Sequence, residues 1–127
     1  MRKNEEYELC KAIATYIRLQ YPGIMHHYDL AGLNLSMAQA GMMKAIQGQR
    51  GFPDLFILEP RGVYHGLFLE VKKEKTKLRK RDGYTPATPH IEEQIIMRED
   101  LLKRGYMCEF GIGFEQCKEI IDNYLKL

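Results

Sequence analysis

The sequence lacks the features that mark exported, membrane-spanning or disulfide-framed proteins. It has 127 residues, no tryptophan and three cysteines, and these cysteines form neither a CxxC nor a Cys/His metal-binding spacing. We therefore expect buried, reduced thiols in a cytoplasmic protein. No apolar run approaches the roughly 20 residues that a membrane span requires. The N-terminal segment turns acidic where a signal peptide would be apolar, so we expect neither export nor a membrane partner.

Net charge is also small, at +2, but the basic residues are concentrated in one segment. Between Lys72 and Arg81 there are seven Lys or Arg residues and one acid, Glu74. Such a segment in a nearly neutral protein favours a local contact with a polyanion such as nucleic acid. A solvated, flexible loop is the alternative interpretation. The candidate contacts are Lys73, Lys75, Lys77, Arg79, Lys80 and Arg81.

Hydrophobic periodicity and turn residues predict helices flanking a small mixed sheet. Leu9, Ile13 and Ile17 recur at helical spacing, and Pro22 follows the end of that helix. We predict helices at 4–20, 36–47, 88–103 and 114–125, strands at 24–28, 54–58, 63–72 and 106–112, and loops at 29–35 and 73–87. The predicted fold class is a single α/β (α+β, mixed-sheet) domain that spans residues 1–127.

The strands predicted at 54–58 and 63–72 are joined by residues 59–62, which include Pro60 and Gly62 and are typical of a turn. An antiparallel pair that folds near residue 62 returns the chain so that position 70 lies near position 54. Glu70 and Lys72 are two residues apart and therefore share a face. The two carboxylates and the ammonium of Lys72 would then converge at one end of the hairpin, a costly arrangement unless a metal ion or a reaction uses it.

Mg²⁺ or Mn²⁺ fits such a site, because both ions prefer oxygen ligands. Asp54 and Glu70 can supply two of them, and the carbonyl of Val71 a third. A divalent ion makes water easier to deprotonate for attack on a phosphodiester. Lys72 could orient or deprotonate that water, or neutralise charge on the phosphate. The alternative interpretation is an exposed Glu-Lys pair on a strand edge, with Asp54 capping a turn.

The residues around this hairpin resemble the VRR-NUC branch of the PD-(D/E)xK nucleases. The matching segments are 51–55 (Gly-Phe-Pro-Asp-Leu), 66–72 (which ends in Glu-Val-Lys) and a following helix that carries Gln94. A bare Pro-Asp…Glu-x-Lys pattern is weak. Combined with the hairpin length, the Gln94 helix and the order of elements, it becomes specific, and the resemblance covers nearly the whole chain.

The resemblance implies a restriction-endonuclease-like core with flanking helices and a metal-dependent DNA endonuclease activity. Asp54, Glu70 and the Val71 carbonyl would bind the metal, and Lys72 would be the catalytic lysine. Gln94 would reach the active site from its helix as the family's supporting glutamine. The alternative interpretation is that Gln94 is an exposed helix residue with no role in the site.

The first helix would add an acid to the catalytic and metal-binding residues. Glu6 is the candidate that continues the face of Leu9 and Ile13, and Glu5 and Glu8 are its competitors.

The resemblance also bears on substrate and assembly. Small stand-alone members of the family resemble phage-type and bacterial homodimers that act on branched DNA such as Holliday junctions. Two symmetric cuts need two active sites, which a C₂ dimer supplies. Apolar residues of the second helix could line the dimer interface, although methionine fills cores as readily. These residues are Met37, Met42, Met43 and Ile46.

Two other functions fit the sequence. One is a catalytically silent nucleic-acid-binding module, against which the intact Asp54, Glu70 and Lys72 set argues; the other is a structural subunit of a nucleoprotein complex. Tyr84, beside the basic stretch, could stack on an exposed base or pack on the domain. His90 is interpreted as incidental.

Overall fold

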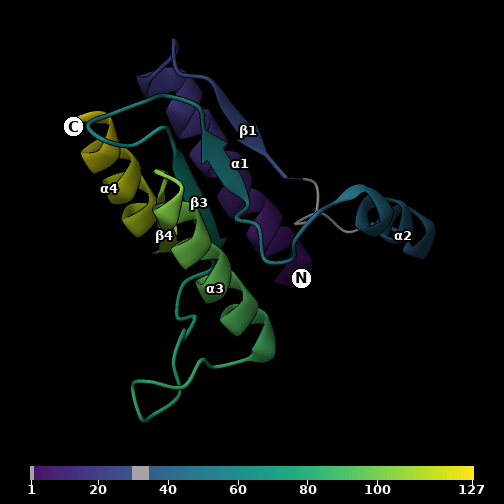
Figure 1. The fold of residues 1–127 in the computed structure, drawn as a ribbon. Coiled ribbons are helices and arrows are strands. Elements are labelled where there is room, and N and C mark those ends of the chain that lie inside the picture. Colours follow the sequence, from purple (N-terminus) through teal and green to yellow (C-terminus); the bar gives the residue numbers. More distant parts are fainter. Residues whose placement is uncertain (1, 30–34) are drawn as a thin grey trace.

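The computed structural model describes residues 2–29 and 35–127, with side chains from residue 5 onward. Helices flank one mixed sheet of strand order β1-β2-β3-β4 (Figure 1), which confirms the predicted α/β fold class with a mixed sheet. Most of the loop predicted at 29–35 lies outside the described residues. The elements are α1 (Arg2–Gln20), β1 (His26–Tyr28), α2 (Met37–Ile46), β2 (Leu55–Ile57), β3 (Leu67–Lys72), α3 (Pro89–Lys103), β4 (Met107–Ile112) and α4 (Phe114–Leu125).

Two of the predicted helices begin at a side-chain cap. The Ser36 hydroxyl accepts a hydrogen bond from the backbone N–H of Gln39, and the Gln39 side chain accepts one from Ser36 N. This reciprocal capping box fixes the start of α2. The Thr88 hydroxyl accepts from the N–H of Ile91 at 3.1 Å, so α3 starts at Pro89.

The β2–β3 pairing has the predicted register. Leu55 lies opposite Leu69 and Ile57 opposite Leu67, so both pairs are centred on residue 62. The strands are shorter than predicted, because β3 starts at Leu67 and not at residue 63. The chain turns over 61–64, where Arg61 and Tyr64 exchange backbone hydrogen bonds of 3.1 and 2.9 Å.

This longer connection is held by contacts that are distant in sequence. The Tyr124 hydroxyl of α4 donates to the carbonyl of Glu59, and the N–H of His65 donates to the carbonyl of Gly105. The β2–β3 ladder ends at Ile57 and Leu67, where these contacts begin, and the tight turn at 61–64 includes residue 62, where the sequence predicts the reversal.

Helices cover both faces of the sheet. On one face, Ile13 and Ile17 of α1 and Ile121 of α4 pack against Leu67 and Leu69 of β3, all at most 1% exposed. Phe68, between those leucines, points to the opposite face and packs with Met97 and Leu101 of α3 against Cys108. Because strand residues alternate between faces, Glu70 and Lys72 continue on the α3 side.

The remaining features concern thiols, membrane propensity and two projecting segments. Cys108 and Cys117 are buried as predicted, Cys10 is only half-buried, and all three thiols are free. Within residues 2–29 and 35–127, no helix has the length and apolar character needed to cross a bilayer. Figure 1 shows α2 and the segment between β3 and α3 extending away from the layered core.

Candidate active site

The start of β2 and the end of β3 meet because the two strands are antiparallel. Asp54 immediately precedes β2, and one of its carboxylate oxygens accepts a hydrogen bond of 2.9 Å from the backbone N–H of Val71. The side chains of Asp54 and Glu70 are in hydrogen-bonding contact. Asp54 and Glu70, separated in sequence by the whole hairpin, therefore lie at one end of it.

The approach to Asp54 depends on Gly51. Its φ is +85°, a conformation that favours glycine, and a Cβ there would lie 2.8 Å from the carbonyl oxygen of Glu93 on α3. Pro53, next to Asp54, is buried. The segment 51–54 thus passes close against α3, which explains in physical terms why glycine and proline precede the aspartate.

Glu70 is an acidic residue buried in the interior of the protein. It is 4% exposed, and its Oε1 has no hydrogen-bond partner among the described residues. Burial, together with the hydrogen bond and negative charge of Asp54, raises the pKa of Glu70 to about 10, although the positive charge of Lys72 opposes this. A buried carboxylate with an unpaired oxygen is costly unless a proton or a cation compensates it.

The chemistry of the donor set fits a hard divalent cation. Asp54 and Glu70 offer carboxylate oxygens and Val71 a carbonyl, with no sulfur or imidazole among them. In the part of the chain that the structure describes, no three or more His, Cys, Asp or Glu side chains form a metal-binding group. The site therefore offers two carboxylates, which suits an ion such as Mg²⁺ that keeps several waters.

The predicted site residues line one cavity of about 310 Å³. Of the three acids considered in the first helix, Glu6 lines this cavity, whereas Glu8 lines a different surface beside Thr15 and Phe114. The negative charge of Glu6 also contributes to the raised pKa of Glu70. The predicted residues on the cavity wall are Glu6, Asp54, Glu70, Val71, Lys72 and Gln94.

His90 and Asp29 also lie on this wall, although the sequence predicted an incidental role for His90 and no role for Asp29. His90 lies one helical turn before Gln94, with 3.2 Å between their Nε2 atoms. The Gln94 side chain is 6% exposed, and its Oε1 has no hydrogen-bond partner among the described residues. Asp29 also lines the cavity, and its N–H donates to the Asp54 carbonyl at 2.8 Å. The i, i+4 spacing of His90 and Gln94 was the available signal for the first of these.

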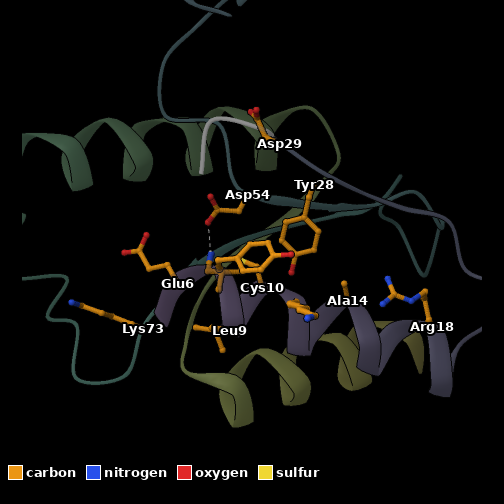
Figure 2. Close-up of a pocket in the computed structure, with 12 residues that line it drawn as sticks. Glu6, Leu9, Cys10, Ala14, Arg18, Tyr28, Asp29, Asp54 and Lys73 are labelled. Carbon is orange, nitrogen blue, oxygen red and sulfur yellow. Dashed lines mark hydrogen bonds between the residues drawn. The ribbon is translucent and has the colours of Figure 1, made fainter. Parts of the chain in front are cut away.

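A second cavity of about 380 Å³ opens beside the first, between α1 and the end of the hairpin. Both cavities are lined by Glu6, Asp29, Asp54 and Val71. Figure 2 shows Glu6, Asp54 and Lys73 at one end, Arg18 at the other, and the Tyr28 ring beside Cys10 between them. Lys73, one of the candidate nucleic-acid contacts, is therefore part of the site's surroundings.

The other candidate contacts lie on the segment from residue 73 to residue 88, which we call the basic arm. Their side chains are exposed. The arm leaves β3 directly after Lys72 and enters α3 at its cap, so it is anchored at both ends to elements that carry site residues. The exposed contacts are Lys75, Lys77, Arg79, Lys80 and Arg81.

The solved structures that are similar to this chain include two VRR_NUC proteins. A VRR_NUC domain protein shares 28% sequence identity and a TM-score of 0.65, with 97% of this chain and 89% of that chain covered. A VRR_NUC domain shares 27% identity and a TM-score of 0.53, with 94% and 97% covered. No family model and no curated protein sequence matches the chain. The similarity in fold and sequence to these two VRR_NUC proteins extends over nearly the whole chain, and it supports a VRR-NUC, nuclease-family domain.

Proposed function

We propose that the protein is a metal-dependent DNA endonuclease of the PD-(D/E)xK type that hydrolyses phosphodiester bonds. One observation carries this proposal: the buried Glu70 carboxylate, with an unpaired oxygen, lies against the Asp54 carboxylate. Such a pair persists where a function requires it, because hydrophobic residues of similar size would stabilise the fold more. The assignment to a nuclease-family domain supports the same conclusion.

In this proposal each residue has a distinct task. Asp54 and Glu70 hold Mg²⁺ or Mn²⁺ together with the Val71 carbonyl, and the hydrogen bond from Val71 N fixes the orientation of the Asp54 carboxylate. A bound ion supplies Lewis-acid polarisation of the phosphodiester and lowers the pKa of an attacking water. Lys72 brings an ammonium to the same cavity, where it neutralises negative charge developing on the phosphate or takes the proton of the water.

Glu6 and Gln94 have supporting roles in this scheme. Glu6 approaches from α1 and adds negative charge that favours a bound cation. The buried amide of Gln94, with its Nε2 3.2 Å from His90, offers its carbonyl oxygen to the cavity as a hydrogen-bond acceptor for a water.

We further propose that the enzyme is a homodimer that selects branched DNA. Support comes from α2, in which no residue is buried. Its apolar side chains Met37, Met42 and Ile46 are 95%, 70% and 81% exposed. A helix with this apolar surface is stabilised when a second copy covers it. Two sites related by a twofold axis would then cut the two strands of a four-way junction symmetrically.

A cleavage panel tests the proposal. Flap, splayed-arm, four-way-junction and linear duplex DNA are incubated with the protein in Mn²⁺ or EDTA. We expect metal-dependent cleavage of the branched substrates, which Asp54→Asn and Lys72→Ala abolish without unfolding the protein. Glu119→Gln, which removes an exposed carboxylate from α4, is the matched control and should retain activity. DNA binding without cleavage by the wild-type protein would instead support a catalytically silent binding module.

A further inference from the structure

The tip of the basic arm is a folded turn. The N–H of Lys80 donates to the Thr85 carbonyl at 2.8 Å, and the N–H of Gly83 donates back to the Lys80 carbonyl at 3.0 Å. Further down the arm, the N–H of Ala87 donates to the carbonyl of Leu78 at 2.9 Å. These bonds fold residues 78–87 into a short hairpin, in contrast to the flexible loop that was one interpretation of the charge run.

The carboxylate of Asp82 stabilises this turn through hydrogen bonds to residues within it. Its Oδ1 accepts hydrogen bonds from the N–H groups of Tyr84 and Thr85 at 2.8 and 2.9 Å, and its Oδ2 accepts from the Thr85 hydroxyl. The hydrogen bonds from Thr85 hold the pKa of Asp82 below its usual range, because they stabilise the ionised carboxylate that closes the turn. The Arg79 guanidinium donates to the Tyr84 carbonyl at 2.6 Å. The backbone of Tyr84 is therefore fixed through both its N–H and its carbonyl.

The side chain of Tyr84 is exposed, although its backbone is fixed. It is 81% exposed, and in the portion of the chain that the structure describes its ring stacks on no other aromatic ring. Packing on the domain, the other interpretation of this residue, is thus excluded. A tyrosine has two side-chain torsions, so immobilising it on a ligand costs little conformational entropy.

The surroundings of Tyr84 determine which ligand fits. Lys80 and Arg81 are exposed on the same hairpin and Lys77 just before it, so a polyanion can run beside the ring. Cations that follow a phosphate backbone, next to an aromatic face, are the combination that binds single-stranded nucleic acid. A base inside a duplex has both faces covered by the neighbouring bases. An unpaired base at a branch point has a free face on which the tyrosine ring can stack.

The position of the arm links such a base to the site. The arm starts at Lys73, directly after Lys72, and ends at the cap of the helix that carries Gln94. In Figure 1 it extends past the N-terminal end of α3. We propose that Tyr84 stacks on an unpaired base at a DNA branch point and thereby positions the adjoining strand for cleavage. This inference rests on the proposed function and names the feature of the substrate that the arm recognises.

The test separates stacking from general attraction to DNA. Dissociation constants are measured in EDTA by fluorescence anisotropy for a splayed-arm DNA and for a linear duplex of equal length. A 2-aminopurine placed at the branch position reports stacking through quenching of its fluorescence. The variants are Tyr84→Ala, Tyr84→Phe and Lys80→Gln. Val63→Ala, at a residue 84% exposed in the β2–β3 connection, is the matched control.

Tyr84→Ala should weaken splayed-arm binding by about 5- to 100-fold, change duplex binding less than about twofold, and abolish the quenching. Tyr84→Phe and Val63→Ala should behave like wild type, and Lys80→Gln should weaken binding to both DNAs. Wild-type affinity and quenching in Tyr84→Ala, or an equal loss on both DNAs, would overturn the inference.

Cleavage by the wild-type protein in Mn²⁺, measured on the same DNAs, judges the proposed function separately. Cleavage combined with an unaffected Tyr84→Ala variant refutes only the role of Tyr84. Binding without cleavage refutes only the nuclease, and the Tyr84 comparison still holds. A protein that binds neither DNA refutes both.

Discussion

Replacing Glu70 by glutamine should stabilise the metal-free protein while abolishing its proposed activity. The pKa of Glu70 rises from 4.5 to about 10 on folding, so at pH 7.5 the folded protein carries a proton on Glu70 that the unfolded chain lacks. Uptake of that proton costs about 1.4 kcal/mol for each of the roughly three pH units above 4.5, or about 4 kcal/mol. Glutamine is neutral in both states and avoids this cost.

The sign of the pH dependence follows from the direction of the shift. A carboxyl with a raised pKa makes the fold most stable below pH 4.5, and this stability is lost progressively as the pH rises toward 10. The glutamine amide, which fits the contact with Asp54 less well than a carboxyl, costs about 1 kcal/mol. Glu70→Gln should therefore be about 2–4 kcal/mol more stable than wild type at pH 7.5 and close to it near pH 4.5.

Urea denaturation in EDTA at several pH values measures this difference. Glu119→Gln, which neutralises an exposed acid, should stay within about 0.5 kcal/mol of wild type at every pH. Added Mn²⁺ should stabilise the wild type, since a ligand that binds only the folded state raises the free energy of unfolding, and should leave Glu70→Gln unchanged. A Glu70→Gln variant no more stable than wild type at pH 8 in EDTA would refute the reasoning.

Three further predictions concern surfaces away from the carboxylate pair. Replacing Lys77, Arg79 and Lys80 together by glutamine should weaken duplex binding and reduce the slope of log K against log salt by up to about 0.9 per lost phosphate contact; an unchanged slope in a salt titration would count against an arm–phosphate contact. Ile46→Glu on α2 should yield monomers by size exclusion with light scattering, whereas Val63→Glu, at an equally exposed site, should not; a dimeric Ile46→Glu protein would exclude this helix as the interface. Burial would raise the pKa of Asp122, but two tyrosine hydroxyls at 2.6 and 2.7 Å and the Lys118 ammonium outweigh burial and lower it, so stability from Asp122 should be lost as the pH falls below about 4. Asp122→Asn should cost about 1–2 kcal/mol in urea denaturation at pH 7, and no change would argue against these bonds.

The parts of the structure that follow from local periodicity were predictable from the sequence. A side-chain period of two fixes which face of β3 carries Glu70, and the turn fixes which residue of β2 lies opposite. Position 54 therefore met position 70 as expected, even though the strand boundaries were wrong. Those boundaries depend on Tyr124 and Gly105, which contact the connection from far away in sequence.

The place of Asp29 on the cavity wall also depends on contacts between residues distant in sequence. Asp29 reaches the cavity because β1 pairs with β2, and no local pattern connects residue 29 with residue 54. The fold of the basic arm depends on several hydrogen bonds to one carboxylate, that of Asp82, and composition alone shows only a charge run.

The basic arm forms the first part of the crossover that joins the parallel strands β3 and β4. A parallel pair needs such a long connection in any case, and within this connection it is α3 that packs against the sheet. Lengthening a loop with fixed ends costs only about 0.6 kcal/mol for each doubling of its length. Arms of different length and sequence could therefore be exchanged at this point. The preference for one DNA structure over another could then be engineered, or could evolve, while the carboxylate pair of Asp54 and Glu70 stays unchanged.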